Sequence, residues 1–201
     1  KGNTVEFWLK KSSFDVSNRK EVIFEVGTMP GKIASQYSGK FRLFLSASSG
    51  SPFFIDYMSG SVGVNLKRIE STITTASMSD NKWHHYAVTV KQLLPSNTLS
   101  IFLYKDGAFT GASVRTNINM GPVDTYMAGT IGGNLGGTDG SLSASLDDFR
   151  FWKGARSPLE IGKYFDKKVY ASDVSNTDYT SRLGAYYKFN KDPLGIDSKD
   201  R

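Results

Sequence analysis

The sequence predicts an all-β protein, a sandwich or a barrel, from two observations. Apolar and polar residues alternate with period two along many short stretches, which suits strands that bury one face. Turn-forming residues separate these stretches, as at 46–52 and at 105–107, where the Asp-Gly pair favours a tight hairpin. Only one stretch carries helical signals, so helices are minor elements of the predicted fold.

The expected strands begin almost at the first residue and follow one another with short connections. They cover 5–9, 21–26, 41–45, 53–57, 62–66, 72–75, 83–90, 100–104, 108–114, 142–152 and 184–189. The glycine-rich stretch at 132–140 has nothing bulky enough to pack, and we expect a loop there. A series of short strands of this kind is typical of sandwiches and barrels.

The one expected helix is a short surface helix near 157–166. Ser157 supplies an N-cap hydroxyl, Pro158 suits the first helical position, and Glu160 is placed to close a capping box. We expect the sandwich to span 1–190. The charged stretch 191–201 is expected to link it to the rest of a longer protein.

Composition and charge exclude several classes of function. The 25 Lys and Arg against 19 Asp and Glu give a formal net charge of +6, but the basic residues are dispersed and no nucleic-acid-binding motif occurs. No apolar run approaches the ~18 residues of a membrane span, so we expect no membrane insertion. The sequence has no cysteine, which excludes disulfides and thiolate metal sites in this chain.

Two pairs of motifs stand in an informative order. WHHYAVT at 83–89 and LYKDG at 103–107 form a strand and a hairpin, and LDDFRFW at 146–152 and ARSPLEI at 155–161 form a strand and a helix start. Together they resemble the central hairpin and the closing signature of laminin-G-like domains, which belong to the concanavalin A-like lectin/glucanase superfamily.

The resemblance implies a jelly-roll sandwich of two antiparallel sheets. The segments 5–9 and 184–189 are similar to the paired terminal strands of that fold, so we expect them to pair. Similar domains occur in large phage structural proteins and bacterial adhesins, which implies an extracellular or virion-surface location. The superfamily includes glycosidases, sugar-binding modules and inert spacers, so the residues must decide the function.

Carboxylate spacing argues against a glycosidase, which needs two carboxyl groups about 5–9.5 Å apart. The superfamily's glucanases carry a Glu-x-Asp-x-x-Glu strand, and this chain has none. Glu21 and Glu25 would share one strand face about 13 Å apart, and the neighbours Asp147 and Asp148 would point to opposite faces. A pair built from different strands stays open, but we expect no enzyme.

Histidine and tryptophan give no functional signal in the sequence. His84 and His85 are the only histidines, and as strand neighbours they face opposite ways, so they are poorly placed to hold one metal. Trp8, Trp83 and Trp152 lie on strands that also carry core residues, and we expect all three to pack in the core.

Calcium is the one metal that the sequence favours, because it binds carboxylate and carbonyl oxygens. The resemblance implies that Asp147, which opens the Leu-Asp-Asp-Phe strand, helps to hold a structural calcium ion, with Asp139 as an added ligand from the glycine-rich loop. The alternative is that Asp147 accepts hydrogen bonds from loop amides and holds no ion.

Binding or scaffolding remains as the function. Sandwich loops recognise sugars through a few polar groups and one aromatic ring, and Asn134, Asp139 and Tyr126 are the candidate ligand-binding residues, unless they are ordinary turn residues. We expect a non-catalytic recognition module for a glycan or a host surface, displayed on a virion or an adhesin. The alternatives are a structural domain that contacts neighbouring subunits and, third, a glycoside hydrolase.

Overall fold

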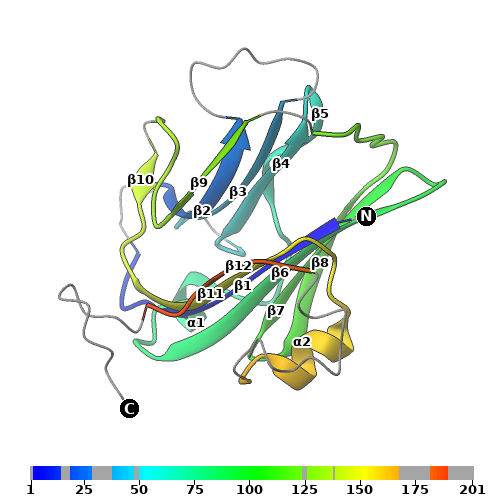
Figure 1. Cartoon of the computed structure of the whole chain (residues 1–201). Coiled ribbons are helices and arrows are strands. Elements are labelled where there is room, and N and C mark those ends of the chain that lie inside the picture. The colour runs from blue at the N-terminus through cyan, green and yellow to red at the C-terminus, as the bar shows by residue number, and fades with distance from the viewer. Residues whose placement is uncertain are drawn as a thin grey trace.

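Two β-sheets stack face to face, as Figure 1 shows for the computed structural model. The structure describes residues 2–14, 19–28, 38–47, 50–123, 126–137, 139–167 and 182–189. The first sheet has the order β12-β11-β1-β6-β7-β8. Its strands are β1 (Gly2–Lys10), β6 (Trp83–Leu93), β7 (Thr98–Lys105), β8 (Ala108–Arg115), β11 (Ser145–Trp152) and β12 (Leu183–Tyr187).

The second sheet has the order β10-β2-β3-β4-β5, and β9 pairs with the same edge of β2 as β10. Its strands are β2 (Glu21–Thr28), β3 (Gly39–Leu45), β4 (Phe53–Ser59), β5 (Val62–Arg68), β9 (Met127–Ile131) and β10 (Gly140–Ser141). All pairings in both sheets are antiparallel except the two-residue contact of β10 with β2. The predicted all-β sandwich is therefore confirmed.

The predicted pairing of the terminal strands is wrong. β12 pairs with β11, and β11 lies between β12 and β1. Both edges of β1 are already occupied, one by β6 and the other by β11, so β1 has no free backbone groups for a third strand. The expected linker at 191–201 lies outside the described residues.

The described residues contain two short helices, where the sequence predicted one. α2 (Pro158–Tyr164) begins as expected, because Ser157 Oγ accepts from the Glu160 N–H and Glu160 Oε2 accepts from the Ser157 N–H. α1 (Thr75–Met78) replaces the strand predicted at 72–75. The β-branched run there favours a strand, but Thr74 forms a capping box with Ser77 instead. Within the described residues no helix is long and apolar enough to span a membrane.

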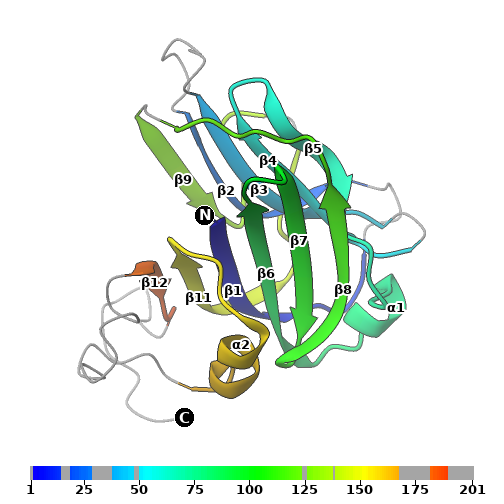
Figure 2. The same ribbon diagram turned by 90° about the vertical axis from the view of Figure 1, so that its right-hand side faces the viewer.

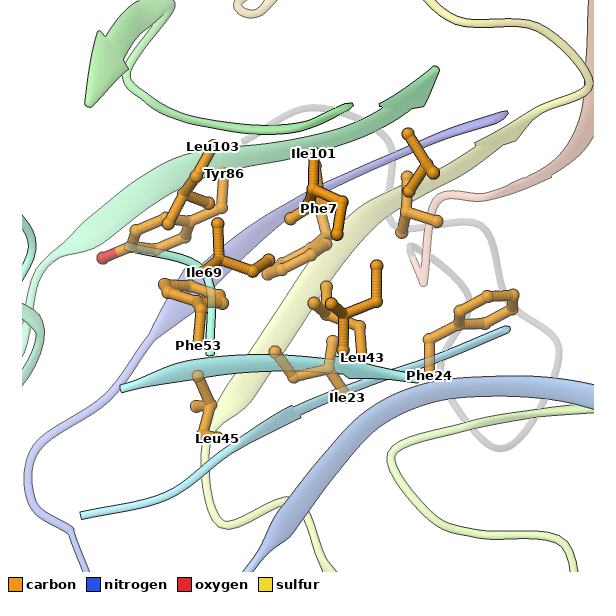
Figure 3. Packing of buried hydrophobic residues seen from close by; sticks show 14 of the residues in the cluster. Phe7, Ile23, Phe24, Leu43, Leu45, Phe53, Ile69, Tyr86, Ile101 and Leu103 are labelled. Atoms are coloured by element: carbon orange, nitrogen blue, oxygen red, sulfur yellow. The ribbon is translucent and has the colours of Figure 1, made fainter. Parts of the chain in front are cut away.

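The core lies between the two sheets and draws aromatic side chains from both (Figure 3). The Tyr86 ring, on β6, lies 6.0 Å from Phe7 on β1 and 5.2 Å from Phe53 on β4. Phe24 on β2 packs within 5.2 Å of Phe149 on β11. Each such side chain contributes about 2 kcal/mol on burial, so the contacts between sheets hold the sandwich together.

The outer face of the first sheet is partly covered by α2, as Figure 2 shows. Ile161 of α2 packs against Ala87 and Tyr104 in a small second core on this face. The rest of the face, along β6, β7 and β8, has no helix over it in the described structure.

The tryptophans do not share one environment, contrary to expectation. Trp152 is buried, but beneath the Arg156 guanidinium, which lies 4.4 Å from its ring. Trp8 is half-buried outside the main core, near Phe165. Trp83 is 43% exposed, because it opens β6 at the end of the sheet, opposite Lys10. The expectation of core packing is therefore wrong for Trp8 and for Trp83.

Candidate functional site

A β-bulge in β2 separates the two glutamates that were expected to share a face. The register shifts between Val22 and Phe24, so that Glu21 lies opposite Leu45 while Glu25 lies opposite Arg42. Leu45 belongs to the core, so Glu21 points inward, where it pairs with Lys11 at 2.7 Å. Glu25 points to the outer face, and the shared-face prediction is wrong because a bulge breaks the alternation.

On the outer face of the second sheet, Glu25 shares a cation, Lys40, with Asp56 on β4. Lys40 Nζ lies 3.7 Å from Glu25 Oε1 and 3.5 Å from Asp56 Oδ2. Asp56 is fully buried, and its Oδ2 accepts from Arg42 Nε at 2.8 Å and pairs with Arg42 Nη2 at 2.7 Å. Its Oδ1 accepts from the Leu66 N–H at 2.6 Å.

We call Glu25, Lys40, Arg42, Asp56 and Asp139 the Arg42 cluster. Among the described residues, every group that contacts the Asp56 carboxylate is a hydrogen-bond donor or a cation, and the carboxylate has no surface open to a substrate. A glycosidase acid must carry a proton and deliver it to a bound substrate. The arrangement therefore suits a structural ion-pair network.

The glycine-rich loop is fastened to this outer face through the Arg42 cluster. Asp139 pairs with Arg42 and, at 3.4 Å, with Lys20. Asn134 Nδ2 donates to the Asp139 carbonyl oxygen at 3.3 Å, and Glu25 Oε2 accepts from the Leu135 N–H at 3.3 Å. The structure thus brings the candidates Asn134 and Asp139 together. Their side chains stabilise the glycine-rich loop, one by a bond within the loop and one by pairing with Arg42.

Tyr126, the third candidate ligand residue, lies elsewhere. It precedes β9, whereas Asn134 and Asp139 follow that strand, so the length of β9 separates them. Tyr126 is 75% exposed and directly precedes Met127. The three candidates therefore do not form one site.

The two proposed calcium ligands are on different sheets and fit calcium poorly. Asp139 already faces the cations Arg42 and Lys20, which repel a metal ion. Asp147 lies on β11 opposite Trp8, and its Oδ1 accepts from the Asp148 N–H at 2.8 Å. In the part of the chain that the structure describes, no three His, Asp or Glu side chains gather as metal ligands.

A second bulge corrects the expected directions of Asp147 and Asp148. Asp148 has a left-handed φ of 46°, and the pairing of β1 with β11 shifts there. Its Oδ2 lies 3.3 Å from Arg150 Nη2 and its Oδ1 accepts from the Tyr186 hydroxyl at 2.8 Å. Both aspartates therefore lie on the outer face. Burial raises the pKa of Asp147. The hydrogen bond from the Asp148 N–H lowers this pKa and the negative charge of Asp148 raises it, and the net shift is upward.

The two histidines face opposite environments, as expected for strand neighbours. His84 Nδ1 lies 2.7 Å from Asp106 Oδ2, and its Nε2 lies 2.9 Å from Asp80 Oδ2, so it ties the β7–β8 turn to the loop before β6. His85 is buried, with Nε2 3.6 Å from Glu6 Oε2.

Glu6 is the centre of a buried charge cluster beside α2. Arg156 pairs with Glu6 Oε1, while Arg150 and His85 lie 3.7 and 3.6 Å from Oε2. Burial alone would raise the pKa of Glu6, but the His85 contact and the charges of Arg156 and Arg150 outweigh it, and the pKa is lowered. The cluster holds the segment before α2 against β1.

A pocket of about 540 Å³ opens at one end of the sandwich, and we call it the end pocket. Its apolar wall comes from both sheets and from the segment before β9: Val26, Phe41, Tyr57, Met58, Met120, Pro122, Val123, Met127 and Phe151. Its polar wall consists of Asn3, Lys40, Ser59, Gln92 and Lys153. Tyr126 directly precedes the lining residue Met127 in the chain but does not itself line the pocket.

The family assignment rests on a match that covers most of the chain. Residues 1–162 match a laminin G family described as the Concanavalin A-like lectin/glucanases superfamily. The chain belongs to this superfamily. A search of curated proteins finds no match. The solved structures that match include a marine alginate lyase from Aplysia kurodai, with 11% identity, a TM-score of 0.41, and coverage of 75% of this chain and 69% of that chain.

Sequence reasoning missed the end pocket of this superfamily domain. The pocket joins Asn3, Tyr57 and Gln92, on three strands far apart in the chain, with Lys153, which follows β11. Single strands show which residues alternate, but the alternation does not reveal which strand ends meet. None of the candidate site residues that the sequence indicated is among the residues that line the pocket.

Proposed function

We propose that this domain is a non-catalytic carbohydrate-recognition module and that the end pocket receives the sugar. The observation that carries the proposal is the composition of the pocket, where aromatic and methionine side chains face amide, hydroxyl and ammonium groups. The apolar faces of sugar rings pack on such walls, and their hydroxyls need polar partners. Membership of a superfamily of lectins and glucanases supports the same ligand class.

The polar groups of the pocket are held in defined positions. Tyr57 Oη donates to Asn3 Oδ1 at 2.8 Å, and Asn3 Nδ2 donates to the Trp152 carbonyl at 3.3 Å. Burial raises the pKa of Tyr57 to about 12, so its hydroxyl keeps its proton at neutral pH. Gln92 Nε2 donates to the Ile118 carbonyl at 3.0 Å, which leaves Oε1 to accept from a sugar hydroxyl.

The absence of catalysis is supported by where the carboxylates lie. The described residues that line the end pocket include lysines and amides but no Asp, Glu or His. The buried carboxylates of Glu6, Glu21 and Asp56 are each paired with an Arg or Lys. Two carboxyl groups flanking one bound sugar, as hydrolysis needs, are not offered by this pocket.

Display in many copies would give a weak pocket a useful strength. A single shallow site of this kind binds near millimolar, or about −4 kcal/mol. Linked copies raise the effective concentration and strengthen attachment without new contacts. We therefore include in the proposal a setting on a virion or adhesin surface, with glycans of a host as the partner.

The test is a glycan array probed with beads that carry many copies of the domain. We expect saturable binding that a free sugar competes and that survives moderate salt. Gln92→Ala, which removes an amide that lines the pocket, should weaken it, whereas Tyr187→Ala, which removes an exposed tyrosine on the first sheet, should not. If no glycan binds in the multivalent form, the structural, subunit-contact function becomes the better one.

A cleavage assay tests the catalytic part separately. Laminarin, agarose, xylan and alginate should release neither reducing ends nor unsaturated products when incubated with the domain. Turnover that disappears when one Asp or Glu is replaced would overturn the non-catalytic proposal while leaving carbohydrate as the ligand.

A further inference from the structure

A second hollow, of about 380 Å³, opens on the outer face of the first sheet beside α2, and we call it the side groove. α2 covers one part of this face through Ile161, and Tyr104, which belongs to the same small core, also lines the groove. Its walls come from β6, β7 and β8 and from the segment that leads into α2. It shares no described lining residue with the end pocket.

Aromatic rings form the floor of the side groove. Phe109 on β8 is 58% exposed, and its ring lies 6.4 Å from Phe102 and 5.8 Å from Tyr104 on β7. Leu93, at the end of β6, is exposed beside them. Adjacent exposed apolar side chains of this kind mark a binding surface more often than isolated ones do.

Two hydroxyls of largely buried residues in the side groove have no hydrogen-bond partner among the described residues. Ser100 is 5% exposed and Tyr104 is 2% exposed, and both line the groove. Among the described residues neither side-chain oxygen has a hydrogen-bond partner, and neither is among the side-chain atoms sealed from solvent. Both oxygens are therefore open to the groove, where a ligand or water can supply the hydrogen bonds that the described protein groups do not.

The lining chemistry points to a sugar. The exposed Phe109 ring, inclined by 58° to Phe102, offers an apolar surface to the C–H face of a pyranose. The two hydroxyls can each donate and accept, as sugar hydroxyls require. Burial raises the pKa of Tyr104, so its hydroxyl remains a donor at neutral pH. Lys91, exposed at the rim, adds a cationic donor. An apolar peptide side chain would leave all of these polar groups unpaired.

We propose that the side groove is a second carbohydrate site, which takes one pyranose ring on Phe109 and Phe102 with its hydroxyls on Ser100 and Tyr104. It shares only the ligand class with the proposed function, because the end pocket lies at a different place and has different residues. Two sites on one domain would let a single copy hold two sugars of a branched or repeating glycan.

The experiment titrates the domain with a panel of methyl pyranosides and follows side-chain methyl resonances by NMR. Leu93 and Ala155 report on the side groove, and Met58 and Met127 report on the end pocket. We expect one pyranoside to shift the Leu93 and Ala155 signals saturably.

Two variants test the residues that carry the proposal. Phe109→Ala should weaken binding at the groove about tenfold, through loss of ring contact. Ser100→Ala should weaken it about fivefold, through loss of one hydrogen bond. Tyr126→Ala is the control that should leave the groove signals unchanged. Phe109 is exposed, so Phe109→Ala should not unfold the domain. If that variant does unfold, Ser100→Ala tests binding at the groove independently.

Each outcome separates the two sites. Shifts of the Leu93 signals that Phe109→Ala weakens support the side groove. This holds even if the methionine signals do not shift and the proposal for the end pocket is contradicted. Shifts at the methionines alone overturn the side groove and support the end pocket. Shifts at neither set of signals, with any pyranoside at its highest soluble concentration, overturn both.

Discussion

Glu6 is the residue on which the outer face of the first sheet depends most. It is fully buried and lies among Arg156, Arg150 and His85. Removal of its charge would leave two buried cations without their counter-ion, which is a costly arrangement. The segment before α2, which carries Arg156, would lose its anchor on β1.

Glu6→Gln should therefore lower the free energy of unfolding by about 3 kcal/mol, as measured by urea denaturation. The matched control is Glu70→Gln. Glu70 is exposed and lies 4.0 Å from Lys67, so its loss should cost less than about 0.5 kcal/mol. Equal effects of the two substitutions would show that the buried cluster has no special role in stability.

The lowered pKa of Glu6 also determines in which direction the stability of the fold changes with pH. A carboxyl whose folded pKa lies below its ordinary value of 4.5 stabilises the fold above that value, and this contribution is lost as the pH falls through the folded pKa. We expect the urea concentration at the unfolding midpoint to decrease as the pH is lowered below 4.5. This decrease should be less steep in the Glu6→Gln variant. An unchanged slope in the variant would contradict the assignment.

Residue directions were predictable from the sequence wherever a strand alternates without interruption. The prediction succeeded for His84 and His85, which face opposite environments. It was wrong for Glu25 and for Asp148, because each lies beside a bulge. A bulge adds one residue to one strand and reverses the faces beyond it, and no residue pattern announces it.

At the scale of elements, the β7–β8 hairpin shows what a local signal determines. Asp106 and Gly107 both have left-handed φ values, 51° and 77°, as the Asp-Gly pair predicts. A Cβ built on Gly107 would lie 2.6 Å from Phe165 Cδ1, so this glycine is required by the close approach of the chain after α2 as well as by its φ.

Gly107→Ala should lower the free energy of unfolding by about 1–2 kcal/mol, because the alanine is strained at a positive φ and collides with Phe165. Thermal melts of the two proteins give the measurement. Gly133→Ala is the control, since a Cβ there has no heavy atom within 4 Å, and it should change stability little. A Gly107→Ala domain as stable as the original would show that the turn relaxes freely.

Elements with their own local signals were the ones that the sequence predicted. Ser157 and Glu160 cap α2 within four residues of each other, so its start was visible without the rest of the fold. β9 was missed because its sequence, MAGTI, shows no alternation and exists as a strand through pairing with β2. α1 was missed because its capping residues sit in a β-branched run.

At the scale of the whole molecule, a first prediction concerns the effect of the calcium concentration on the melting temperature. An ion bound only to the native state raises the melting temperature with its concentration. Since the Arg42 cluster neutralises Asp139 and Asp147 lies on the other sheet, we expect equal melting temperatures in millimolar calcium and in chelator. A rise with calcium that Asp147→Asn removes would restore the metal site that the resemblance implied.

The architecture was predictable from the sequence, but the two binding hollows were not. Alternation and turns are properties of neighbouring residues, and they sufficed for the sandwich. The end pocket brings Asn3 and Gln92 beside Met127, and the side groove brings Ser100 beside Ser157. Such meetings depend on the strand order and on the position of α2, which no stretch of sequence encodes by itself.

Three methionines allow the most direct measurement of carbohydrate binding at the end pocket. Met58, Met120 and Met127 line the pocket, whereas Met78 is buried in the core and serves as an internal reference. The measurement is a titration of methyl-labelled methionine signals with the glycan that binds best on the array. The account predicts saturable shifts of the three pocket signals, an unchanged Met78 signal, and weaker binding in Gln92→Ala. Saturable binding of the glycan with all four signals unmoved would contradict it.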